Sequence, residues 1–143
     1  MTKALDESEA WAVINAGRIG HLGCIDHDEP YVVPINYLVE AGRIYSHSLP
    51  GRKISALRTH ARACLQVDQI QDDFHWQSAI AFGSYEEVVD DRRRTVVLRQ
   101  LVDRFPALTP VESHLARERW EVVVFCLRID RVTGVAEDSR LGD

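Results

Sequence analysis

Six segments rich in β-branched and aromatic residues, separated by turn signals, constrain the fold of this chain more than any other feature. Polar or glycine-containing turns at 26–30 and 41–42 favour antiparallel hairpins between neighbouring segments. Few helical segments come between them, so we expect a mainly β fold, a closed antiparallel barrel of six strands with flanking helices. The predicted strands span residues 19–25, 31–39, 43–47, 63–68, 76–89 and 121–129, and the last is extended by 132–136.

Three segments have the pattern of helices. Residues 6–17 begin with acidic side chains and end at Gly17, and a short helix is expected from 54 to about 60. Residues 91–105 predict an amphipathic helix capped by Asp90 or Asp91, with the basic triplet 92–94 on its exposed side. Its expected buried stripe comprises Val97, Leu98, Leu101, Val102 and Phe105. A loop is expected at 106–110 and a helical turn at 111–117.

Two residues predict irregular positions within the strands. Pro34 has no backbone N–H, so its strand should lie at a sheet edge, contain a bulge, or leave backbone groups free for another partner. Gly83 predicts a bulge or bend in the long strand 76–89. The polar residues 69–74 are expected to form the connection that precedes this strand.

Composition limits the possible functions. The 143 residues fit a single domain, 1–143, and a net charge of −5 argues against binding nucleic acid or an anionic membrane surface. Cys24, Cys64 and Cys126 are an odd number in apolar contexts, which indicates reduced thiols and a cytoplasmic protein. No signal peptide or membrane span is expected. The histidines lack metal-ligand spacing, and no Gly-x-Gly-x-x-Gly follows a strand, so no metal site or Rossmann nucleotide site is expected.

The sequence Gly51-Arg52-Lys53, at the start of the second predicted helix, has the character of an anion site. Glycine permits close backbone approach, arginine can contact two phosphate oxygens, and lysine adds a mobile charge. The helix start contributes free N–H groups and the positive end of its dipole. The alternative is an ordinary solvated surface, since such triplets also occur by chance.

The order of these motifs resembles a known family. The chain carries Gly-Arg-Ile-Gly-His-Leu-Gly at 17–23, Glu-Pro-Tyr-Val-Val-Pro-Ile-Asn-Tyr at 29–37 and Gly-Arg-Ile-Tyr-Ser-His-Ser at 42–48. Gly-Arg-Lys at 51–53 and Trp-Gln-Ser-Ala-Ile-Ala-Phe-Gly at 76–83 complete the set. Together they resemble the FMN-binding split-barrel proteins of the pyridoxamine 5′-phosphate oxidase-like superfamily, nearest to the nitroimidazole-resistance type. The resemblance covers about residues 6–136.

This resemblance implies a six-stranded antiparallel split β-barrel and a homodimer with FMN in a cleft between the two barrels. Residues along the isoalloxazine ring would be Val33, Pro34, Ile35 and Asn36. His47 and Ser48 would close over the ribityl chain and phosphate, and Arg52 and Lys53 would bind the phosphate. The segment that approaches the flavin, commonly from the partner subunit, would be Trp76, Gln77 and Ser78. Relatives often carry a basic residue where Gln77 stands.

The implied activity is an FMN-dependent oxidoreductase that acts on nitro-aromatic or other small aromatic compounds, with a nicotinamide or another reductant as donor. His47 could contact phosphate or donate a proton near the flavin, or be a surface histidine. Trp76 is explained equally well by packing at a dimer seam. The end of the chain lacks the arginine and histidine motif of true pyridoxamine phosphate oxidases, so vitamin B6 oxidation is not expected. Alternatives are a non-enzymatic flavin- or haem-binding module and a barrel that has lost its cofactor.

Overall fold

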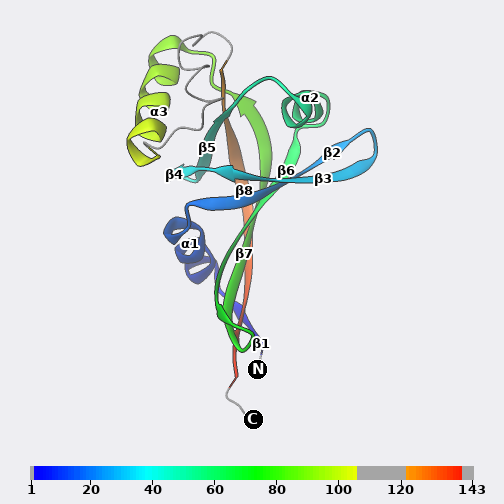
Figure 1. The fold of residues 1–143 in the computed structure, drawn as a ribbon, viewed down its shortest axis with the longest axis vertical. Helices are drawn as coiled ribbons and strands as arrows, with labels where there is room; N and C mark the ends of the chain where they lie inside the picture. The colour runs from blue at the N-terminus through cyan, green and yellow to red at the C-terminus, as the bar shows by residue number, and fades with distance from the viewer. Residues whose placement is uncertain (1, 106–121, 140–143) are drawn as a thin grey trace.

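The computed structural model describes residues 2–105 and 122–139, so the expected loop at 106–110 and helical turn at 111–117 lie outside the described residues. A long strand pair, β7 and β8, runs through the molecule, and three helices flank the sheet (Figure 1). In chain order the elements are β1 (Thr2–Leu5), α1 (Glu7–Ala16), β2 (Ile19–Asp26), β3 (Glu29–Asn36), β4 (Leu38–Glu40), β5 (Arg43–Ser48), α2 (Arg52–Thr59), β6 (Arg62–Asp72), β7 (His75–Glu87), α3 (Asp91–Arg104) and β8 (Val123–Asp138).

The sheet is a split barrel. Its antiparallel strands follow the order β3-β2-β6-β7-β8-β5-β4, and β1 pairs with β8. Although β3 and β4 lie at opposite edges, only Tyr37 separates them in the sequence, so the sheet must curl until its edges approach each other. Ser46 on β5, the neighbour of edge strand β4, donates a 2.6 Å hydrogen bond to the carbonyl oxygen of Asn36 at the end of edge strand β3, which shows that the two sides of the sheet meet. The predicted mainly β split barrel is confirmed, and of the alternatives for the strand that contains Pro34 the structure shows the edge position.

The described residues contain eight strands where six were expected. The predicted strand 31–39 is divided at Tyr37, because this side chain turns fully into the core and its hydroxyl donates a 2.5 Å hydrogen bond to the carbonyl of Ile14 on α1. Burial raises the pKa of Tyr37 to about 12, so the hydroxyl stays protonated at neutral pH. The additional strand β1 is stabilised by pairing with β8, far away in the sequence, which a local pattern does not reveal.

The predicted connection at 69–74 is wrong for most of its length. Strand β6 continues to Asp72 and forms a hairpin with β7, with Asp68 opposite Ser78 and Ile70 opposite Trp76. The polar side chains at this end lie on exposed strand positions, where they need no hydrophobic partner. The turn itself is limited to residues 73–74. The expected irregularity at Gly83 is confirmed by a register shift between Phe82 and Gly83 in the β7–β8 pairing.

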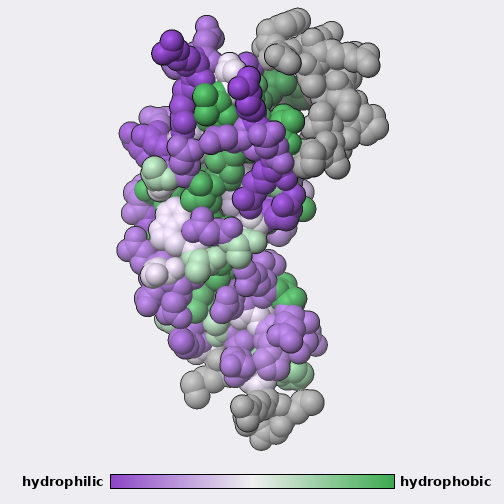
Figure 2. All heavy atoms as spheres, turned by 90° about the vertical axis from the view of Figure 1, so that its left-hand side faces the viewer, coloured by the Kyte–Doolittle hydropathy of each residue, from purple (hydrophilic) through white to green (hydrophobic). Residues whose placement is uncertain are grey.

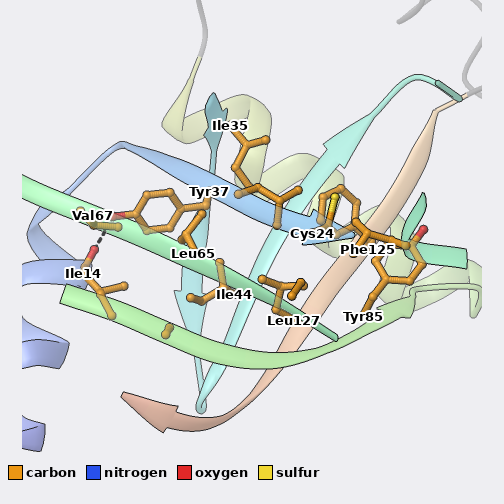
Figure 3. Packing of buried hydrophobic residues seen from close by; sticks show 14 of the residues in the cluster. Ile14, Cys24, Ile35, Tyr37, Ile44, Leu65, Val67, Tyr85, Phe125 and Leu127 are labelled. Carbon is orange, nitrogen blue, oxygen red and sulfur yellow. Dashed lines mark hydrogen bonds between the residues drawn. The ribbon is translucent and has the colours of Figure 1, made fainter. Parts of the chain in front are cut away.

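The main core fills the inside of the barrel (Figure 3). Helix α1 covers one end by packing against β6, β7 and β8, and it begins with a capping box between Asp6 and Glu9. Cys24 and Cys126 are buried free thiols, and Cys64 is free and half-buried. The largest fully buried side chains of this core are Ile14, Leu22, Tyr37, Ile44, Ile54, Leu57, Leu65, Phe125 and Leu127.

Helix α3 covers a second, smaller cluster, and Asp90 caps it by accepting a hydrogen bond from the backbone N–H of Arg93. Val97 and Leu101 are buried as expected, but the prediction that Val102 is buried is wrong, because this residue is 45% exposed. Arg93 and Arg94 also depart from the expected exposed triplet, because both are half-buried. Arg93 contacts Glu40 and Tyr45, and Arg94 donates a hydrogen bond to the carbonyl oxygen of Val122. No helix within residues 2–105 and 122–139 is long and apolar enough to cross a bilayer. Figure 2 shows a mostly hydrophilic face with apolar residues visible between the polar ones.

Candidate functional site

The predicted anion site lies at the start of α2. The helix begins at Arg52, two residues earlier than expected, so both Arg52 and Lys53 belong to its first turn. Gly51 is the N-cap and provides no side-chain hydrogen bond, and the first turn contains no acidic residue. The N-terminal N–H groups therefore keep their capacity to bind an anion. The positive end of the helix dipole attracts an anion, as the two basic side chains do.

The Arg52 side chain is held by the hairpin that β2 and β3 form. Its Nε donates a 2.6 Å hydrogen bond to Oδ2 of Asp26, and its guanidinium carbon lies 4.3 Å from the ring centroid of Tyr31. The other carboxylate oxygen of Asp26 contacts Nδ1 of His27 at 2.8 Å. The hydrogen bonds from Arg52 and His27 lower the pKa of Asp26, so the carboxylate is charged at neutral pH.

Lys53 occupies a drier position than Arg52. Its side chain is half-buried, and burial lowers the pKa of its ammonium group. The nearby Cys24 thiol is buried as well, and burial raises its pKa, so it supplies no thiolate at neutral pH. An anion bound at the helix start would restore electrostatic stabilisation that Lys53 has lost with its hydration.

The remaining expected residues of this half of the site surround α2. On β3, Ile35 is buried and Val33 is half-buried against the core, whereas Pro34 and Asn36 are exposed on the outer face. His47 and Ser48 end β5, just before the loop that leads to Gly51. The structure thus brings β3, the end of β5 and the start of α2 into one region of a single chain.

The second half of the expected site lies elsewhere. Trp76, Gln77 and Ser78 are at the beginning of β7, at the opposite end of the molecule from α2 (Figure 1). Ser84, which pairs with the first residue of β6 just after α2, is eight strand residues away from Trp76, or about 26 Å. Within one chain, these three residues therefore do not approach Arg52.

The outer face of the sheet contains a polar row that sequence reasoning missed. His21 on β2 contacts Gln66 on β6 through Nδ1 and Oε1 at 2.9 Å, and Gln66 donates a 2.9 Å hydrogen bond to Ser78. Pro34 lies beside His21 in the strand register. Strand alternation identifies the outward positions, but the pairing order β3-β2-β6-β7 that aligns them is not visible in the sequence. The same face carries four exposed apolar residues, Ile19, Val32, Ile70 and Val135.

A separate open pocket of about 470 Å³ lies between α1 and the β4–β5 turn. None of the expected site residues lines it. Its walls are formed by Glu7, Trp11, Asn15, Val39, Glu40, Ala41, Gly42 and Ile129. Among the described residues, no group of three histidine, cysteine or acidic side chains is arranged to hold a metal ion.

An antiparallel split barrel with a basic helix start beside an edge strand defines the class of protein. The model of the family described as pyridoxamine 5′-phosphate oxidase matches residues 6–136. The chain therefore belongs to the pyridoxamine 5′-phosphate oxidase family, and the resemblance inferred from its motifs is confirmed.

Individual relatives agree with this assignment. The chain is 27% identical to an uncharacterised protein of Rhizobium meliloti (strain 1021), over 94% of each chain. It is similar in structure to a FAD-binding protein from Mesorhizobium loti, with a TM-score of 0.77, 28% identity, and coverage of 96% of this chain and 99% of that one. A putative 5-nitroimidazole antibiotic resistance protein from Bacteroides thetaiotaomicron shares the fold, with a TM-score of 0.73, 22% identity, and coverage of 95% and 89%.

Proposed function

We propose that the protein is a flavin-dependent oxidoreductase that binds FMN and transfers electrons to a small aromatic or nitro-aromatic compound. The observation that carries this proposal is the start of α2, where Arg52, Lys53 and uncapped N–H groups lie beside an edge strand. Family membership and the FAD-binding relative from Mesorhizobium loti support a flavin as the ligand. A bound flavin would supply the hydride and electron chemistry.

The residues present fit such a cofactor. A flavin phosphate is anionic, and the start of α2 combines a guanidinium, an ammonium and helix N–H groups. Edge strand β3 directs the N–H and C=O groups of alternate residues away from β2, where they could bind the polar edge of the isoalloxazine ring. Val33, Ile35 and Asn36 would orient the ring, and His47 and Ser48 would lie towards the ribityl chain. His47 is our candidate for holding a proton near the flavin.

Turnover is the test of the oxidoreductase proposal. We expect protein loaded with FMN to be bleached by a nicotinamide donor without oxygen, and a nitro-aromatic compound to restore the oxidised flavin spectrum. Free FMN at the same concentration is the control for the rate in solution. Stoichiometric flavin that no donor reduces would contradict an enzymatic role and favour a flavin-binding module for storage or sensing.

The cofactor site is proposed to be completed by a second copy of the chain. Trp76, Gln77 and Ser78 lie about 20 to 26 Å along β7 from the region of α2, so they can belong to the same flavin site only if a partner supplies them. The outer face of the sheet offers exposed apolar residues and the polar row around Gln66, a mixture that suits an interface.

Sizing tests this arrangement. We expect the flavin-loaded protein to elute as a dimer, and Val32→Lys on the outer face to shift it towards monomer with loss of flavin. Val89→Lys, at another exposed apolar position, is the matched control and should stay dimeric. A stable monomer that still binds flavin would remove the partner role of Trp76 and Ser78.

A further inference from the structure

Arg52 makes an incomplete set of contacts in the described structure. Only its Nε donates to Asp26, and no described residue accepts a hydrogen bond from its two Nη groups. A guanidinium has five N–H donors, so four remain for another acceptor. The Asp26 carboxyl group is mostly shielded, with 16% of its side chain exposed, whereas 51% of the Arg52 side chain is exposed. Asp26 is thus the more fixed member of the pair.

Tyr31 adds a second restraint from the same hairpin. The guanidinium lies over its ring at 4.3 Å from the centroid, which restricts the plane of the group, while Asp26 restricts its rotation. Asp26 and Tyr31 lie on the two strands that flank a tight turn at His27 and Asp28. Positive φ angles of 49° and 64° at these two residues mark a two-residue hairpin loop. The hairpin therefore offers Arg52 a short and well-defined support.

We propose that Asp26 and Tyr31 are positioning residues, which hold Arg52 with its Nη groups available to a phosphate at the start of α2. This inference rests on the proposed function. An arginine side chain loses considerable rotamer freedom when it binds a ligand, and a side chain that is already fixed loses less. Asp26 and Tyr31 would thus increase phosphate affinity without contacting the phosphate.

Asp26 also has an effect that lowers phosphate affinity, and it must be separated from the positioning of Arg52. A carboxylate close to a bound phosphate repels it, so removal of its charge alone would strengthen binding. Asp26→Asn removes the charge but keeps an oxygen that can accept the hydrogen bond from Nε. Asp26→Ala removes both. A positioning role therefore predicts that the two substitutions differ, whereas a purely repulsive role predicts tighter binding in both.

The experiment is an equilibrium titration with FMN, followed by flavin fluorescence, on the wild-type protein, Asp26→Ala, Asp26→Asn, Arg52→Ala and the double variant Asp26→Ala/Arg52→Ala. We expect Asp26→Ala to bind FMN about three- to ten-fold more weakly, the effect of one side chain losing its preorganisation. Asp26→Asn should bind at least as tightly as wild type. When Arg52 is already alanine, Asp26→Ala should cause no further loss of FMN affinity. This double-mutant cycle isolates the part of the Asp26 effect that depends on Arg52.

Tyr31 provides an independent pair of variants. Tyr31→Phe keeps the ring and should bind FMN like wild type, whereas Tyr31→Leu should weaken binding about three- to ten-fold. Thermal unfolding of each variant shows whether the hairpin remains folded, and the Phe and Asn variants stay informative if the larger truncations unfold.

Three results would overturn the inference while the proposed function stands: wild-type affinity in Asp26→Ala, an equal loss from Asp26→Ala in the Arg52→Ala background, or tighter binding in both Asp26 variants. Wild-type protein that binds no flavin gives a different result, because it overturns the proposed function itself.

Discussion

Replacement of Arg52 and Lys53 together by alanine is expected to weaken FMN binding by about 3 kcal/mol or more, which is roughly a hundred-fold or greater. Each side chain would lose a charge-assisted contact with the phosphate, and the helix start alone would remain to bind it. The loss should be largest at low ionic strength, because part of the interaction is between exposed charges. Titration of each protein with FMN measures the effect directly.

The matched control is Arg92→Ala/Arg99→Ala, which removes the same charge from exposed positions of α3. It separates a local loss of phosphate contacts from a general change in net charge, and it should leave FMN affinity within about two-fold of wild type, as expected for distant surface charges. If the Arg52 and Lys53 variant retains flavin as tightly as wild type, the phosphate assignment is wrong.

Gly83→Ala is expected to destabilise the folded protein by about 3 kcal/mol or more. A Cβ atom at this position would lie 2.3 Å from the carbonyl oxygen of Arg128 and 2.9 Å from its carbonyl carbon. Both are backbone atoms of β8, which is paired with β7 on either side of the bulge, so they cannot move away without breaking the pairing. Urea or thermal unfolding should show a clearly lowered midpoint.

Gly51→Ala serves as the comparison for this stability measurement. A Cβ there would meet only the carbonyl oxygen of Leu49, at an unstrained 3.9 Å. The substitution should cost less than about 1 kcal/mol, the scale of a changed N-cap. Equal stability of Gly83→Ala and wild type would show that β8 can yield at the bulge, contrary to the close approach in the structure.

Local chemistry made much of the fold predictable. Asp90 or Asp91 and the acidic start of α1 indicate helix beginnings, Pro34 limits its strand to an edge, a bulge or a position with free backbone groups, and Gly83 indicates a bulge or bend. Each of these depends on the properties of a single residue or turn. The break at Tyr37 could not be predicted, because the reason for it is a buried hydrogen bond to Ile14 on a distant helix.

The candidate site shows the same division. The basic character of Arg52 and Lys53 at a helix start follows from residues adjacent in the sequence. The support of Arg52 by Asp26 and Tyr31 depends on how α2 docks against the β2–β3 hairpin, which is a tertiary contact. The distance of Trp76 from this region likewise appears only when β6 and β7 are seen to form one long hairpin.

The most direct test of flavin binding is the visible absorption spectrum of freshly purified protein, repeated after FMN is added and the excess is removed. We predict flavin absorption bands that remain with the protein. Protein that stays colourless and releases all added FMN would contradict the proposed cofactor site. A sharp Soret band in place of the flavin bands would show that the barrel binds haem instead.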